Sequence, residues 1–255
     1  MIPQIAIFGQ KYSSYNLAVM VGIIFAILAF YKWEKTIPST EKDTVISIVG
    51  VDLVVGFFSA FLGNKLLHFQ TWEAFKGHFF EFTGMTFLCG LIGSVLFFAV
   101  VYYMVYRDWN KLYRTLNSIT PYFIVAQIWG RIGCFLGGCC FGKPTDGILG
   151  VRYPESSYAY LKYEDEKLYP TPVFEIVWLF AILFCIQFIK ICRQEKVICY
   201  FCIYSFGRFI IEFFRGDNRG NILWGISPSQ RICLGILLIM MVLLCQRKRC
   251  GRHYI

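Results

Sequence analysis

Residues 85–106 read MTFLCGLIGSVLFFAVVYYMVY, a run of apolar and small side chains without a single charge. A helix needs about 20 such residues to cross the hydrocarbon core of a bilayer. Similar runs recur along the chain and define seven predicted spans: 16–33, 45–68, 85–106, 119–141, 170–191, 198–214 and 230–246. Because the runs are continuous, they exclude a β-barrel, whose strands would alternate in polarity. We therefore predict an all-α, polytopic membrane protein with seven transmembrane helices.

The composition agrees with this class of protein. Hydrophobic residues make up 57% of the 255 residues and charged residues 16%, whereas soluble domains average under half and about a quarter. Since the spans leave only short loops, we predict a single transmembrane domain over residues 1–255. The net charge of +9 is typical of lysine and arginine near lipid head groups. No basic stripe with exposed aromatics stands outside the spans, so we expect no nucleic-acid partner.

The distribution of lysine and arginine predicts an orientation. The connections 34–44, 107–118 and 192–197 and the C-terminal tail, with the flanking Lys32 and Lys190, carry 13 of these residues, and the opposite side carries 8. Cytoplasmic loops are enriched in lysine and arginine. We therefore expect the N-terminus outside the cell and the C-terminus in the cytoplasm.

Charged residues away from the ends of the predicted spans are the first candidates for function, and we single out Asp52, Lys65, Arg131, Glu175, Arg208 and Glu212. A charge at the bilayer centre costs about 2.5–3.5 kcal/mol, so such residues usually face a cavity or a partner. Arg208 and Glu212 lie four residues apart on one helical face, and buried pairing between them is one interpretation. An arginine in a membrane cavity also suits a lipid phosphate, whose oxygens match the guanidinium fork.

The cysteines and histidines do not form a recognisable metal motif. The 11 cysteines are irregularly spaced, so no disulfide framework is predicted. Cys199 and Cys202 have CxxC spacing but no second pair and no nearby histidine. The histidines at positions 68, 78 and 253 have no partner at ligand spacing. We therefore expect no metal site and no cofactor.

The segment GRIGCFLGGCCFGK (130–143) resembles the central motif of the bacterial prolipoprotein diacylglyceryl transferases. The resemblance continues, in order along the chain, over YNLAVM (15–20), FLGNKL (61–66), GMTFLCGLIG (84–93), YPTPVFE (169–175), YSFGRFIIEFFR (204–215) and ISPSQ (226–230). It implies an enzyme of the bacterial plasma membrane that moves a diacylglyceryl group from phosphatidylglycerol to a cysteine thiol in a prolipoprotein signal peptide, releasing glycerol phosphate. The implied partners are phosphatidylglycerol, that signal peptide and the lipid bilayer.

The resemblance also implies roles for individual residues. Arg131 and Arg208 would stabilise the phosphate, and Glu212 would orient Arg208; these three form the expected catalytic set. Arg215 would lie near the outer head-group level. The expected substrate-binding residues are Tyr15, Cys134, Cys139, Glu175, Tyr204 and Arg215.

Five positions depart from the family pattern. Leu88 stands at a histidine of the third-span motif, Cys89 at a glycine, Cys134 at an asparagine, Cys139 at a glutamate and Tyr169 at a histidine. Since leucine cannot take a proton, the base that would receive the proton of the acceptor thiol is open. A nearby arginine is one candidate for favouring the thiolate.

Other hypotheses therefore stay open at this stage. The same phospholipid site could serve a different acceptor, in a paralogue of the family. One of Cys134, Cys139 and Cys140 could act as a covalent nucleophile, or the three could pack together and form a local redox pair. A transporter or lipid-binding protein without catalytic activity would also bury charges in its spans.

Overall fold

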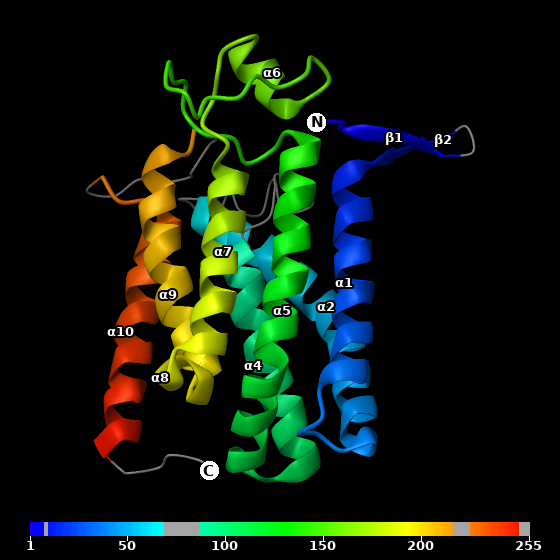
Figure 1. Ribbon diagram of the computed structural model, residues 1–255, viewed down its shortest axis with the longest axis vertical. Helices are drawn as coiled ribbons and strands as arrows, with labels where there is room; N and C mark the ends of the chain where they lie inside the picture. Colours follow the sequence, from blue (N-terminus) through cyan, green and yellow to red (C-terminus); the bar gives the residue numbers. More distant parts are fainter. Residues whose placement is uncertain (8–9, 69–86, 217–224, 250–255) are drawn as a thin grey trace. The chain divides into compact units, whose positions relative to one another are not determined.

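The computed structural model describes residues 1–7, 10–68, 87–216 and 225–249, and helices dominate this part of the chain (Figure 1). Within it, seven helices are long and apolar enough to cross a membrane, one in each predicted span. They are α1 (Ser14–Trp33), α2 (Ser39–His68), α4 (Phe87–Tyr106), α5 (Trp109–Gly137), α7 (Thr171–Phe188), α9 (Lys196–Ile211) and α10 (Pro228–Arg249). The predicted all-α, seven-helix class is confirmed.

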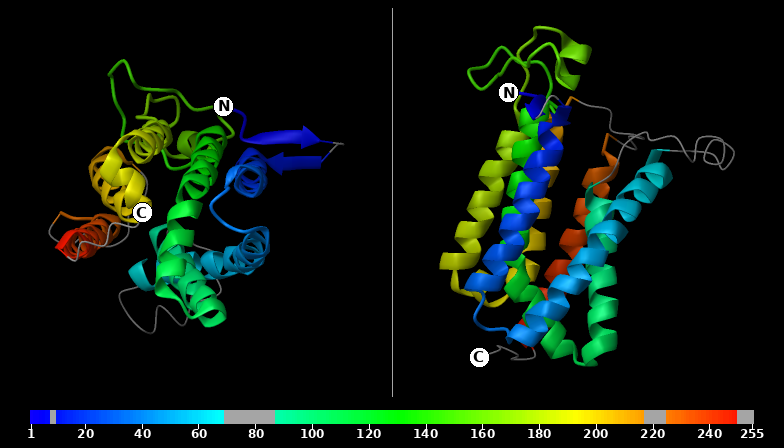
Figure 2. Two further views of the ribbon diagram at one scale, coloured as in Figure 1. Left: turned by 60° about the horizontal axis from the view of Figure 1, so that its bottom comes forward. Right: turned by 90° about the vertical axis from the view of Figure 1, so that its right-hand side faces the viewer.

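Smaller elements connect the long helices. Strands β1 (Gln4–Ile7) and β2 (Gln10–Ser13) pair antiparallel, and this hairpin projects from the start of α1 (Figure 2). Two short helices, α6 (Tyr158–Tyr163) and α8 (Lys190–Gln194), precede and follow α7. A single 3₁₀ turn, η1 (Glu212–Phe214), ends α9.

Helix α5 differs most from its predicted bounds, because it begins ten residues earlier and ends four residues earlier than expected. The carboxylate of Asp108 fixes its start by accepting hydrogen bonds from backbone N–H groups two and three residues later, at 2.8 and 3.2 Å. Gly138, with a φ of +65°, ends the helix. Cys139 and Cys140 therefore lie in the following loop, and the prediction that a span continues to residue 141 is wrong.

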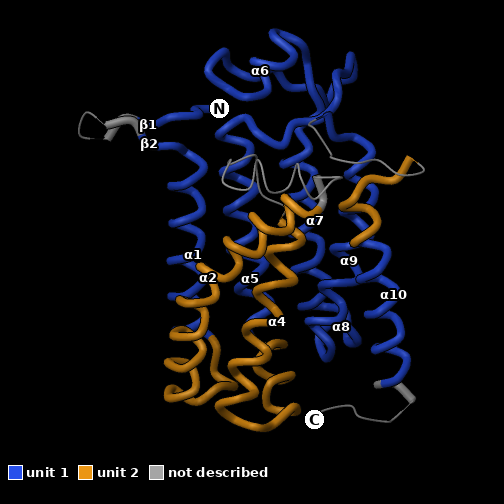
Figure 3. Tube along the Cα trace, turned by 180° about the vertical axis from the view of Figure 1, so that it is seen from behind, with its two compact units in different colours: residues 1–33, 119–218, 233–255 blue, residues 34–118, 219–232 orange. Residues whose placement is uncertain are grey.

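The chain forms two compact units, shown in different colours in Figure 3. Unit 1 contains residues 1–33, 119–218 and 233–255, and unit 2 contains residues 34–118 and 219–232. Helices α5 and α10 each contribute residues to both units. The single domain over 1–255 stays a prediction.

In unit 2, helices α2 and α4 pack through small residues. A Cβ atom at Gly90 would lie 3.0 Å from both the Ala60 Cβ and the Gly56 carbonyl oxygen. Small side chains at such positions let membrane helices approach closely. Two positions from the sequence analysis, Lys65 on α2 and Leu88 on α4, are buried in this unit.

A buried polar network joins three helices of unit 2. The Glu41 carboxylate of α2 accepts hydrogen bonds from the Tyr102 hydroxyl (2.5 Å) and the Thr115 hydroxyl (2.8 Å). The Lys111 ammonium group lies 3.2 Å from the second carboxylate oxygen. These partners satisfy a carboxylate that would otherwise be costly to bury.

In unit 1, α5 lies between α1 and α7 (Figure 1 and the left view of Figure 2), and α9 packs against α7. Gly207 of α9 faces Trp178 of α7, whose indole Nε1 donates to the Ile203 carbonyl at 2.9 Å. A Cβ atom at Gly207 would lie 2.0 Å from that indole nitrogen. Glycine at this position is therefore required by the close approach of the two helices.

The loop between α5 and α7, residues 138–170, lies at the end of unit 1 where α5 ends and α7 begins (Figure 1). It has a small core of its own, formed by Phe141, Tyr153, Ala159 and Leu168. The Ser157 side chain caps α6 by accepting the Tyr160 N–H at 3.2 Å. The loop thus has a defined structure of its own at the end of α5 and the start of α7.

Candidate active site

A buried carboxylate on α7, Glu175, collects three arginines from different parts of unit 1. The Nε atom of Arg131 on α5 lies 2.8 Å from Oε2 of Glu175. One Nη atom of Arg208 on α9 lies 2.8 Å from Oε1, and one of Arg215 lies 3.7 Å from the same oxygen. The structure therefore brings together charged residues of α5, α7 and α9, and Arg215 beyond the end of α9, which are far apart in the sequence.

Glu212 completes this arginine cluster, which we define as Arg131, Arg208, Arg215, Glu175 and Glu212. Its carboxylate lies 3.2 Å from Arg208, one helical turn earlier on the same face. All five side chains are less than a tenth exposed. Three guanidinium groups and two carboxylates leave one positive charge in excess.

The excess charge gives the cluster a chemical preference. Burying ions is costly, and the cost is recovered only when each charge has well-placed partners. Guanidinium groups present paired N–H donors that match the oxygens of a phosphate or carboxylate. A net positive, enclosed group of arginines is therefore suited to an anion of that kind.

The backbone explains how Arg215 joins the cluster although it lies beyond the end of α9. The helix tightens into η1, and Arg215 then adopts an extended conformation. There it pairs with Gly142 of the α5–α7 loop, and Lys143 N–H donates to the Phe214 carbonyl at 2.8 Å. A Cβ atom at Gly142 would lie 2.5 Å from the Cβ of Tyr169, so this crossing requires glycine.

The two predicted tyrosines border the cluster in different ways. Tyr204 on α9 is buried, stacks on Tyr200 with ring centroids 5.5 Å apart, and lies beside Arg131. Tyr15, in the first turn of α1, is 41% exposed. Its backbone lies against Gly133 of α5, where a Cβ atom would come within 3.0 Å of the Tyr15 carbonyl oxygen. Tyr15 therefore lies at the rim of the site and Tyr204 in its interior.

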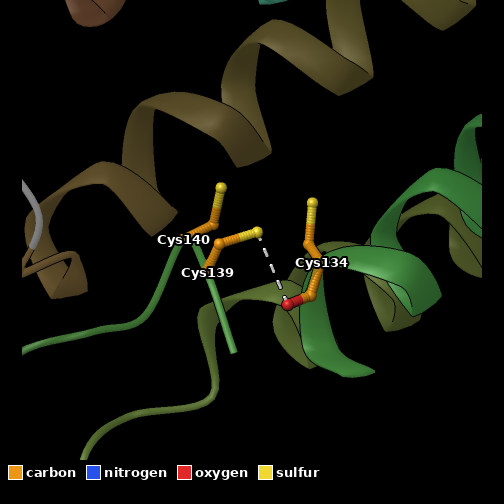
Figure 4. Close-up of side chains that lie close together, drawn as sticks. All are labelled: Cys134, Cys139 and Cys140. Atoms are coloured by element: carbon orange, nitrogen blue, oxygen red, sulfur yellow. Dashed lines mark hydrogen bonds between the residues drawn. The ribbon is translucent and has the colours of Figure 1, made fainter. Parts of the chain in front are cut away.

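The predicted substrate-binding cysteines lie at the end of α5, together with a third (Figure 4). Cys134 belongs to the last turn of the helix, and Cys139 and Cys140 follow it. The three sulfur atoms all lie within 4.8 Å of one another. The Cys139 thiol donates to the Cys134 carbonyl at 3.6 Å, and the Thr171 hydroxyl at the start of α7 donates to the Cys140 carbonyl.

The surroundings distinguish the two loop cysteines. Hydrogen bonding with the thiols of Cys134 and Cys139 holds the pKa of Cys140 well below its usual range, and the positive charges of Arg215 and Arg131 act in the same direction. Hydrogen bonding with the neighbouring thiols raises the pKa of Cys139. Cys140 is therefore the loop thiol that loses its proton first.

Sequence reasoning missed several residues of this site. Gln127, one turn before Arg131 on α5, accepts a hydrogen bond from the Tyr200 hydroxyl at 2.8 Å. Cys233 of α10 is fully buried within electrostatic range of the arginine cluster. The four-residue spacing of Gln127 from Arg131 was a usable signal. Nothing in the local sequence distinguished Cys233 from the other cysteines in apolar runs.

Comparison with known proteins identifies the family. The model of the prolipoprotein diacylglyceryl transferase family matches residues 4–246. The chain belongs to this family. It is 32% identical over 246 residues to the phosphatidylglycerol–prolipoprotein diacylglyceryl transferase of Clostridium tetani, a match that covers 91% of this chain and 92% of the relative.

Other relatives carry the same name. A second such transferase of Clostridium perfringens is 32% identical over 241 residues, covering 91% of this chain and 90% of the relative. One from Dehalococcoides mccartyi is 26% identical over 243 residues, covering 92% and 89%. The resemblance drawn from the sequence motifs is thus confirmed. The protein is a multi-pass membrane transferase, and the hypothesis of a transporter without catalytic activity is set aside.

Proposed function

We propose that this protein transfers the diacylglyceryl group of phosphatidylglycerol to the thiol of a signal-peptide cysteine in a prolipoprotein, and that the arginine cluster is its phosphate site. The thioether forms as the carbon–oxygen bond to the phosphate breaks, and glycerol phosphate leaves. The observation that carries this assignment is the buried excess of one guanidinium group over the carboxylates. Charge develops on the departing phosphate, and donors already in place around it lower the barrier.

The roles within the cluster follow from its contacts. Arg131 and Arg208 lie on opposite oxygens of Glu175, at 2.8 Å each, so that Glu175 sets their spacing. Glu212 restrains the other side of Arg208. We assign Arg131 and Arg208 to the phosphate, and Glu175 and Glu212 to holding the guanidinium groups in position. Tyr204 supports Arg131 from the interior, and Arg215 meets the lipid head group at the edge of the bilayer.

The orientation belongs to the same proposal. With the N-terminus outside and the C-terminus in the cytoplasm, the α5–α7 loop and Arg215 face the outer surface. Signal-peptide cysteines and phospholipid head groups can both reach a site near the outer surface of the membrane. This orientation is checked with Ser156→Cys, introduced into a variant from which the other cysteines have been removed. A membrane-impermeant maleimide should label this loop residue in intact cells.

The test of the function is glycerol phosphate release from labelled phosphatidylglycerol by the purified full-length protein, with a peptide carrying the acceptor cysteine. Arg131→Ala should lower kcat by about 100-fold or more, as expected for loss of a preorganised donor. Arg152→Ala is the matched control, because Arg152 is a largely exposed arginine of the same unit. Release that needs no peptide would favour a different acceptor, and full activity of Arg131→Ala would reject the phosphate site.

A further inference from the structure

The three sulfur atoms of Cys134, Cys139 and Cys140 have the spacing of ligands around a soft metal ion. A zinc–sulfur bond is about 2.3 Å long, so two sulfurs of a tetrahedral site lie about 3.8 Å apart. The sulfur atoms of the three thiols lie within 4.8 Å of one another. Figure 4 shows the three side chains close together, Cys134 on α5 and the other two in the segment that follows it.

The backbone holds this thiol triad, Cys134, Cys139 and Cys140, in place. The Cys139 N–H donates to the Cys134 carbonyl at 3.1 Å, which closes the end of α5. The backbone of Cys140 has a φ of +58°, a conformation that residues other than glycine adopt rarely and at a cost of about 1–2 kcal/mol. Such strain persists where the surrounding structure imposes it, often at functional sites. Here the Thr171 hydroxyl anchors the Cys140 carbonyl.

The environment of the triad is polar, which simple packing of small side chains does not require. The guanidinium groups of Arg131 and Arg215 lie within electrostatic range of Cys140. Tyr153 is 3% exposed and packs against Gly138, yet its hydroxyl has no hydrogen-bond partner among the described residues. That hydroxyl lies within electrostatic range of Cys139 and Cys140. This buried hydroxyl without a hydrogen-bond partner indicates that a further polar or charged group is bound beside the thiols.

The proposed reaction also needs a means of generating the acceptor thiolate. The described part of unit 1 contains no histidine. Its two buried carboxylates in the cluster, Glu175 and Glu212, are both engaged by arginines. A zinc ion with three protein ligands keeps one position open, and a thiol that binds there does so as the thiolate.

We propose that Cys134, Cys139 and Cys140 bind one zinc ion through three thiolates and leave its fourth position to the sulfur of the acceptor cysteine. This inference rests on the proposed function. The acceptor thiol releases its proton to water as it binds the zinc. Its sulfur then attacks the glyceryl carbon that carries the phosphate ester: the carbon–sulfur bond forms, the carbon–oxygen bond breaks, and glycerol phosphate leaves with the electron pair. No oxidant or reductant takes part.

Metal binding is tested on the full-length protein in detergent, stripped with a chelator and dialysed against Zn²⁺. We expect one zinc ion per chain, and binding at least about tenfold weaker when any triad cysteine is replaced by serine. The double variant Cys199→Ser, Cys202→Ser is the matched control, because it removes two other neighbouring thiols of unit 1 and should bind zinc as the unmodified protein does. Zinc binding unchanged by the triad variants would overturn the proposal.

A serine variant that fails to fold would lose zinc for an uninteresting reason, so the unmodified protein provides a second measurement. Zn²⁺ should slow alkylation of Cys139 and Cys140 at least about tenfold relative to Cys185, as followed by peptide mass spectrometry. Equal protection of all three, or of none, contradicts the site.

The acceptor role is tested with Co²⁺ in place of zinc, because sulfur-to-cobalt absorption reports each added thiolate. A peptide with the acceptor cysteine should intensify this absorption, and the same peptide with serine should not. An unchanged spectrum means a structural metal and overturns the acceptor role. Full turnover by zinc-free protein also overturns it. If the proposed function is wrong but the site is real, zinc binds and no glycerol phosphate is released in any metal state.

Discussion

Glu175→Gln perturbs the residue that holds the arginine cluster together. It keeps the shape of the side chain and removes the charge that lies 2.8 Å from Arg131, 2.8 Å from Arg208 and 3.7 Å from Arg215. Two unit charges about 4 Å apart attract by about 4 kcal/mol at the effective dielectric constant of about 20 that suits protein sites. Breaking a buried ion pair by removing one partner costs about 3–5 kcal/mol in practice. We expect a loss of that size in the free energy of unfolding.

The assay is unfolding in mixed micelles with increasing sodium dodecyl sulfate, followed by tryptophan fluorescence. Glu155→Gln is the control: it makes the same chemical change at an exposed position in the α5–α7 loop, where about ±0.5 kcal/mol is expected. The variant has an excess of two guanidinium groups, so phosphatidylglycerol should restore more stability to it than to the unmodified protein. A free energy of unfolding within about 1 kcal/mol of the unmodified protein would show that Glu175 does not hold the arginine cluster together.

Three further substitutions test the packing that positions the site. Gly142→Ala should unfold at a lower denaturant concentration and lose activity, because its Cβ would lie 2.5 Å from the Cβ of Tyr169. The control is Gly130→Ala, which has open space around the new Cβ and should match the unmodified protein. Equal behaviour of the two variants refutes the crossing geometry. Gly207→Ala should separate α7 from α9 and cost about 1–3 kcal/mol, read by the same unfolding assay, and an unaffected variant contradicts the close approach. Tyr102→Phe removes a 2.5 Å hydrogen bond to Glu41 and should cost about 1.5–3 kcal/mol, with no change in KM for the lipid; a raised KM would contradict a purely structural network.

The sequence predicted the helices well because each span is a long apolar run, and it predicted the Arg208–Glu212 pair because both residues lie on one helix. It could not predict that Glu175 is the common partner of three arginines. That contact depends on the packing of α5, α7 and α9, which local spacing does not encode. Arg215 is a similar case, since it reaches the cluster only after α9 has ended.

The cysteines show the opposite limitation. Cys134, Cys139 and Cys140 were visible as unusual residues, but the predicted span ran through residue 141 and placed them on a regular helix. On a regular helix, residues five and six apart point in different directions, so the close approach of the three sulfur atoms would not be expected. The helix instead ends at Gly137, and the turn at Gly138 folds the two loop thiols back toward the third.

Contact between the arginine cluster and the lipid phosphate is the central claim, and solid-state NMR tests it most directly. The full-length protein, with ¹⁵N-labelled arginine, is reconstituted with phosphatidylglycerol, and the dipolar coupling between guanidinium nitrogens and phosphorus is measured. We predict a coupling typical of hydrogen-bonded contact, about 4 Å or less, that weakens in Arg131→Ala, because only Arg208 and Arg215 then remain near the phosphate, and that is unchanged in Arg152→Ala. A coupling that survives Arg131→Ala unchanged, or none in the unmodified protein while it turns over lipid, would contradict the account.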